Sequence, residues 1–165
     1  MFVAIKRSVL ISTLILLSVV AIQAQEEAQA RVDNPRETTS AERPAPVFSE
    51  YKGIKIGSPA SDVRSNLEKY LESKGDAQDL LVVSDNETVQ VFYDDQGKVR
   101  AVSIDYLPKN SSAPTAVQVF GKEIEPRADG SVYALERYPE LGYWISYNRT
   151  AGENPIVTVT IQAMK

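Results

Sequence analysis

The residues of this sequence best suited to contact a partner are aromatic and lie close together. Tyr133, Tyr138, Tyr143, Trp144 and Tyr147 fall within one stretch of 15 residues. Aromatic rings bury large areas, and they are enriched at the energetic centres of protein interfaces. These five residues are therefore the candidate binding residues.

Strand periodicity divides part of this cluster between two faces. In a strand over 142–148, Tyr143, Ile145 and Tyr147 share one face, and Trp144 lies on the opposite, more polar face. We expect the face with Ile145 to be the core side. Trp144 would then anchor a protein partner or stack on a sugar ring. The alternative is that the N-terminal linker or a helix covers Trp144.

Two carboxylates could carry out chemistry if the fold brings them together. Asp105 and Glu136 lie on predicted strands and could form the acid–base pair of a glycoside hydrolase. Asp94 and Asp95 instead fit a hairpin turn, and the spacing of a calcium loop is missing around them. The alternative function is therefore a carboxylate-based hydrolase acting on cell-envelope or extracellular polysaccharide.

The sequence contains no histidine and no cysteine. Zinc sites of the Cys/His type, Cys–His nucleophiles and Ser–His triads are therefore excluded. Without disulfides, the packed core alone must hold the fold. We expect a non-catalytic protein without a metal or a cofactor.

Residues 1–24 have the features of a signal peptide. Lys6 and Arg7 form a positively charged start, and the apolar run 8–22 follows it. This run of 15 residues is shorter than the roughly 20 that a membrane-spanning helix needs. The alternative is an uncleaved segment that anchors the protein in the membrane.

Small residues mark two cleavage positions, after Ala24 and after Ala30. The location that follows is periplasmic or secreted. Contact with a membrane is expected only if the leader is retained.

Residues 25–50 are rich in charge and proline, which predicts a disordered linker. Without Lys6 and Arg7, the net charge changes from −4 to −6. An acidic surface repels phosphate backbones, and the sequence has no cluster of basic residues. We therefore expect no nucleic-acid partner.

Residues 51–165 are predicted to form one α+β domain. Ser58 as N-cap, Pro59 at the first helical position and Gly75 at the end predict a helix over about 59–73. The apolar positions expected to face the core are Val63, Leu67, Tyr70 and Leu71.

Alternating residues predict an antiparallel sheet. A turn over 94–97, with Gly97, separates two of its strands. A second helix over 113–120 would turn Val117 and Phe120 inward and end before Gly121. The order of elements suggests two tandem units of one helix and three strands. The strands are predicted over 80–84, 88–93, 99–107, 131–137, 142–148 and 156–163.

The segment from Ile54 to Val63 runs from an apolar strand residue through Gly57 to a helix start. It resembles the opening of the BamE (SmpA/OmlA) and β-lactamase-inhibitor-protein-like fold, over about 55–107 and, loosely, over 113–163. Proteins of those two groups carry a lipid-accepting cysteine or disulfides, which this sequence lacks. The resemblance implies an exported binding or envelope-assembly module.

The residues and the resemblance lead to the same expected function. The protein would act through one sheet face and its loops, and its partner would be a protein or an envelope component.

The leader generates the first testable prediction. Unstructured, exposed backbone is where cleavage concentrates, and the polar stretch after the leader meets that requirement. N-terminal sequencing of protein from the native host should find a start near Gln25 or Arg31, in a fraction outside the cytoplasm. A full-length product in the membrane would replace the soluble form with an anchored one, and a full-length cytosolic product would contradict both.

Overall fold

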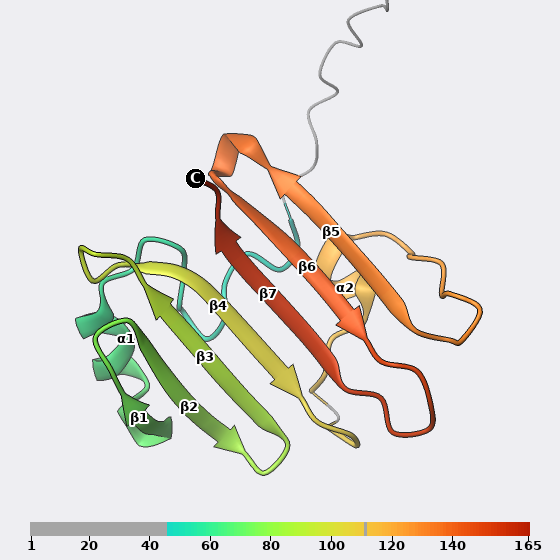
Figure 1. Ribbon diagram of the computed structural model, residues 1–165, viewed down its shortest axis with the longest axis horizontal. Coiled ribbons are helices and arrows are strands. Elements are labelled where there is room, and N and C mark those ends of the chain that lie inside the picture. The colour runs from blue at the N-terminus through green and yellow to red at the C-terminus, as the bar shows by residue number, and fades with distance from the viewer. Residues whose placement is uncertain (1–45, 111) are drawn as a thin grey trace, which may run out of the picture. The chain divides into compact units, whose positions relative to one another are not determined.

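In the part of the chain that the structure describes, seven antiparallel strands form one sheet, with two short helices beside it (Figure 1). The structure is a computed structural model and describes residues 46–110 and 112–165. The predicted signal peptide and most of the predicted linker lie outside these residues. In the part of the chain described, no helix is long and apolar enough to span a membrane.

The elements follow the chain in the order α1, η1, β1 to β4, α2, β5, η2, β6 and β7. Their bounds are α1 Ala60–Asn66, η1 Glu68–Tyr70, β1 Leu71–Lys74, β2 Gln78–Ser84, β3 Glu87–Tyr93, β4 Val99–Tyr106, α2 Ala116–Phe120, β5 Val132–Tyr138, η2 Pro139–Leu141, β6 Tyr143–Arg149 and β7 Val157–Ala163.

The sheet order is β1-β2-β3-β4-β7-β6-β5. Each half is a meander of neighbouring strands, and the halves meet where β4 pairs with β7. The expected antiparallel sheet is confirmed. The predicted three strands per half are wrong for the first half, because β1 adds a fourth strand at its edge.

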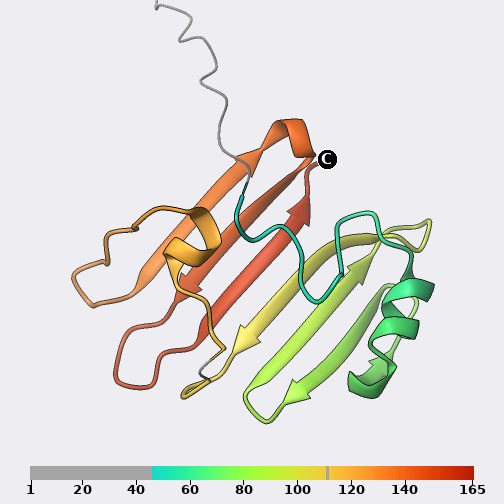
Figure 2. The same ribbon diagram turned by 180° about the vertical axis from the view of Figure 1, so that it is seen from behind.

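One face of the sheet is covered and carries the core. Figure 2 shows α1, α2 and the segment 46–58 on this side, which we call the covered face. The alternate residues of every long strand point into it and are buried or half-buried, as the period of two requires. Its fully buried side chains include Leu81, Val89, Val91, Val102, Ile104, Ile145, Val159 and Ile161.

The segment 46–58 packs on this core as extended chain. The Phe48 N–H donates to the Val119 carbonyl at 3.3 Å, and Tyr51 and Ile54 exchange backbone hydrogen bonds of 3.0 and 2.8 Å. The Tyr51 hydroxyl also donates to the buried Glu87 carboxylate. Residues 46–50, which the sequence places in the linker, therefore lie against α2.

The first helix is shorter than predicted. Its α-helical part ends at Asn66, because Leu67 leaves the helical region with φ −120° and ψ 19°. Ser58 does not cap it. Pro59 occupies the N-cap position, and the Ser58 side chain accepts from the Lys55 N–H instead.

The chain from Leu71 to Lys74 forms an edge strand instead of a last helical turn. Leu71 pairs with Leu81, so the ladder to β2 supplies hydrogen bonds that the helix would have provided. Val63 and Leu67 are buried as predicted. Residue spacing alone could not distinguish a helical turn from a strand at Leu71, because Leu71 packs against the same core from a strand.

The second helix also differs in its inward face. Thr115 caps it through a capping box with Gln118, so α2 begins at Ala116. Phe120 is buried as predicted, but Val117 is 36% exposed and Val119 takes the core position. Gly121 ends the helix at φ +74°, as the sequence indicates.

A buried ion pair ties α1 to the sheet. Arg64 donates from Nε and Nη2 to the two Asp79 oxygens at 2.8 and 3.0 Å. The Tyr93 hydroxyl and the Gly75 N–H donate to the same carboxylate at 2.7 and 3.1 Å. Asp79 is fully buried, and each of its oxygens accepts two hydrogen bonds.

These hydrogen bonds decide how Asp79 titrates. Burial by itself raises the pKa of Asp79, but the donors from Arg64, Tyr93 and Gly75 outweigh it and lower the pKa below its ordinary value. A carboxyl group with a lowered folded pKa stabilises the fold above its unfolded pKa of about 3.9. This contribution is lost as the pH falls from about 4 toward the folded pKa.

Asp79→Asn should therefore lower the free energy of unfolding by about 3 kcal/mol at pH 7, because Arg64 loses its ion-pair partner. The difference from wild type should shrink as the pH falls below about 4. Urea unfolding at several pH values measures both effects. Asp95→Asn, in the exposed turn after β3, is the matched control and should change stability by no more than about 0.5 kcal/mol. Equal effects of the two variants would contradict the assigned role of Asp79.

Candidate functional site

The side of the sheet opposite the covered face carries no helix and no described loop across it (Figures 1 and 2). We call it the open face. The strand register places its side chains in lateral rows, and those on the four middle strands β3, β4, β7 and β6 form its centre. These residues are Thr88, Gln90 and Phe92; Ala101, Ser103 and Asp105; Thr158, Thr160 and Gln162; and Trp144, Ser146 and Asn148.

The centre of the open face is poor in charge. Asp105 is the one ionisable residue among these twelve, although 24% of the whole sequence is charged. Most of the others carry a hydroxyl or an amide, which both donate and accept hydrogen bonds. Depletion of charge with retained hydrogen-bonding groups is typical of the middle of a protein interface.

Short side chains in the middle of this face hold one another across strands. Ser103 and Thr160 face each other on β4 and β7, with their hydroxyl oxygens 3.1 Å apart. The Thr158 hydroxyl donates to Asp105 at 2.7 Å. The sheet register therefore fixes these groups.

Trp144 lies on the open face, on β6, at one edge of the centre formed by the four middle strands. In the register it stands between Arg137 on β5 and Gln162 on β7. Its side is opposite to Ile145, which is fully buried, and Trp144 itself is half-buried. None of the described helices covers it.

The structure places the five predicted binding residues on two opposite faces of the sheet. Tyr133 shares the open face, is 48% exposed, and has the Arg127 guanidinium 5.6 Å from its ring centre. Counted along the strands, it lies about four residues, or roughly 13 Å, from Trp144.

The other three tyrosines point to the covered face. Tyr138 and Tyr147 are only 4% and 3% exposed, and Tyr143 packs on Tyr138 with ring centres 6.0 Å apart. They do not contribute to the open face, because the alternation that places Trp144 there turns its neighbours to the covered face.

The two carboxylates proposed as a catalytic pair do not meet. Asp105 lies on the open face, whereas Glu136 lies in the row of Ile145 and Ile161 on the covered face. Glu136 is also engaged, because Lys122 pairs with it and the Tyr138 hydroxyl donates to it at 3.1 Å. Side chains on opposite faces of a sheet cannot flank one glycosidic bond.

The turn carboxylates have a local structural role. The Asp94 Oδ1 accepts from the Lys98 and Gln96 N–H groups, each at 2.9 Å. These hydrogen bonds lower the pKa of Asp94, and the hydrogen bond from Lys98 has the largest effect. Within residues 46–110 and 112–165, no group of acidic side chains is arranged to hold a metal ion.

Sequence reasoning missed Phe92. This residue lies on β3, in the same lateral row as Trp144 on β6, and its ring centre is 5.8 Å from the Arg100 guanidinium. A signal for it was present. On β3, β4 and β7, every second residue is uncharged and small or polar, apart from Phe92 and Asp105. Reading these alternations together would have outlined the open face before the structure.

No protein family model, curated protein or solved structure matches this chain. The resemblance to the BamE and inhibitor-protein fold therefore stays a prediction. The candidate site rests on the geometry of the open face.

Because Trp144 is the only tryptophan, its fluorescence reports on the open face alone. We expect acrylamide to quench it in the folded protein, less strongly than in the same protein unfolded in concentrated urea. A half-buried ring explains this intermediate result. The unfolded sample supplies the fully exposed reference. Absence of quenching would show that another part of the chain covers Trp144.

Proposed function

We propose that this protein is an exported, non-catalytic binding module that engages a protein or another envelope component through its open face. The observation that carries this proposal is a continuous sheet face whose centre has one charged side chain, Asp105, and the only tryptophan. Export rests on the predicted leader.

The size of this face suits a specific complex. Seven strands about 4.8 Å apart and about seven residues long give a surface of roughly 600 Å². A standard protein interface buries about 800 Å² on each partner. The open face with the adjoining loops reaches that size.

The side chains indicate which partner surface would fit. Hydroxyls and amides such as Ser103, Thr160 and Gln162 can bond to hydroxyls, amides and backbone groups of a partner. Trp144 and Phe92 offer flat rings for apolar contact or stacking. Nearly uncharged surfaces gain little from ion pairs, so binding should depend only weakly on salt.

Both halves of the sheet contribute to the surface. Phe92 and Ser103 come from the first half, and Trp144 and Thr160 from the second. We propose that the halves, each with one helix before its strands, are related tandem units whose union doubles the width of the face.

The test uses a partner recovered from the envelope and secreted fractions of the native host, and calorimetric titration measures binding, because Trp144→Ala has no tryptophan left to report on it. Trp144→Ala should weaken the complex by about 2 kcal/mol, roughly thirtyfold in dissociation constant, if Trp144 is an anchor. Leu141→Ala removes a 49% exposed apolar side chain outside the open face and should leave affinity unchanged.

A second pair of variants tests the face without Trp144. Thr160→Lys places an ammonium group in the middle of the open face, where a bound partner would have to desolvate it. We expect binding to be lost and the fold to be kept, while Thr160→Ser binds normally. Wild-type affinity of Thr160→Lys, measured on folded protein, would contradict the proposed surface.

A further inference from the structure

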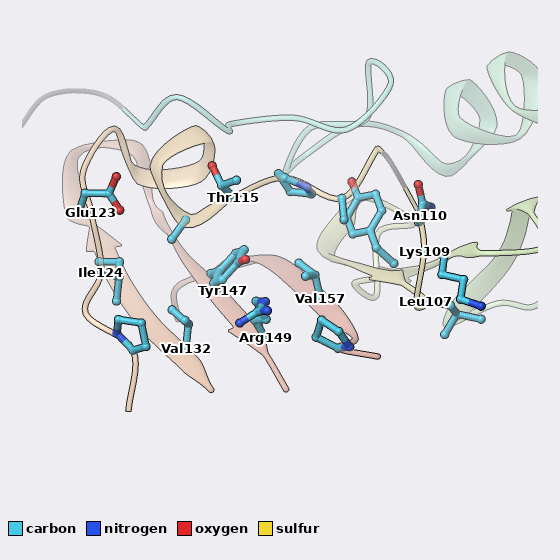
Figure 3. Close-up of a pocket in the computed structure, with 16 residues that line it drawn as sticks. Leu107, Lys109, Asn110, Thr115, Glu123, Ile124, Val132, Tyr147, Arg149 and Val157 are labelled. Atoms are coloured by element: carbon cyan, nitrogen blue, oxygen red, sulfur yellow. The ribbon is translucent and has the colours of Figure 1, made fainter. Parts of the chain in front are cut away.

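A cavity of about 410 Å³ lies on the covered side of the sheet, away from the open face (Figure 3). Residues at the end of β4, at the start of β5 and β7 and at the end of β6 line it, together with the loops that flank α2. Its volume is within the range of small-molecule sites, about 300–1,000 Å³. None of the twelve side chains at the centre of the open face lines it.

The walls of this cavity are largely apolar. Val132 and Val157 are nearly buried strand residues on one side, and Ile124 from the loop after α2 lies near Val132 (Figure 3). Pro126 and Pro155 also line it. An apolar body of a ligand could displace water from these walls at a gain in free energy.

The polar groups of the cavity are mostly donors. Arg149 lies beside Tyr147 (Figure 3) and uses one N–H on the Gly130 carbonyl at 3.1 Å. It forms no ion pair with any residue in 46–110 or 112–165, and Lys109 also lines the cavity. The carboxylate of Glu123, an exposed residue, is the one negative charge among the lining residues.

Two tyrosine hydroxyls add to these donors. Tyr106 and Tyr147 have buried rings, and neither hydroxyl is hydrogen-bonded to another described residue. In the described part of the chain, no buried side-chain oxygen lacks a partner, so neither hydroxyl is fully buried, and both residues line the cavity. Burial raises the pKa of Tyr147 and raises that of Tyr106 to about 12, which keeps both protonated.

We infer that this cavity binds a small amphipathic carboxylate. Its carboxylate would accept from the Arg149 guanidinium and the Tyr147 hydroxyl, and its apolar body would lie between Val132, Val157 and Ile124. Charge-assisted hydrogen bonds from a guanidinium suit the planar carboxylate. The inference is independent of the proposed function, because it uses the opposite side of the sheet.

Octanoate is the probe, and octan-1-ol, with the same apolar chain and no charge, is the matched control ligand. Calorimetric titration into protein processed by its native host should detect octanoate and give at least tenfold weaker binding for octan-1-ol. Backbone NMR shifts should change at Val132, Tyr147 and Val157, while Trp144 emission stays constant. Shifts confined to the open face, or a change in Trp144 emission, would overturn the assignment.

Variants then test the donors. Arg149→Gln should weaken octanoate about tenfold or more, and Tyr147→Phe, which keeps the buried ring, should weaken it severalfold. Arg100→Gln removes a cation outside the cavity and should have no effect. Absence of octanoate binding to wild type, or unchanged affinity in Tyr147→Phe together with equal binding of octan-1-ol, would refute the site even if Arg149→Gln did not fold.

Discussion

The pairing of β4 with β7 is the interaction on which the rest of the structure depends. Six residue pairs, from Ala101–Gln162 to Tyr106–Val157, join the two meanders, and no other pair of the described strands connects them. On the covered side, Val102 and Ile104 meet Ile161 and Val159 in the middle of the core. On the open side, the same pairing aligns Ser103 with Thr160. One ladder therefore creates both the continuous core and the continuous outer surface.

The two faces solve different physical problems. A charged side chain that is buried on the covered face needs hydrogen-bond partners. Asp79 has them, because Arg64, Tyr93 and Gly75 supply four hydrogen bonds. Glu87 and Glu136 are held in the same way, by Tyr51 and by Lys122 and Tyr138. The centre of the open face limits the problem, because its side chains are neutral apart from Asp105, which accepts a hydrogen bond from Thr158. A partner that covers this centre would therefore desolvate a single charge.

Much of the sheet follows from local pattern. Six strands were predictable because their residues alternate and Gly or Pro punctuates their turns, as at Gly97 and Gly142. The same alternation put Trp144 opposite Ile145. It could not recover β1, because Leu71 continues the helical spacing of Val63 and Leu67 and only its pairing with Leu81 makes it a strand. Nor could it separate Asp105 from Glu136, since their faces depend on registers across four strands.

The sequence by itself determined the chemistry that is available: no histidine or cysteine, one tryptophan, and strands with one apolar and one polar side. These properties are local or compositional, so no folded context is needed to read them. Tertiary structure decided which polar sides join into one face and that Tyr138, Tyr143 and Tyr147 turn inward. It also brought Tyr106, Val132, Arg149 and Val157 together around one cavity. Such decisions depend on strand order and on pairs of residues more than 50 positions apart, such as Ser103 and Thr160, and no local spacing encodes them.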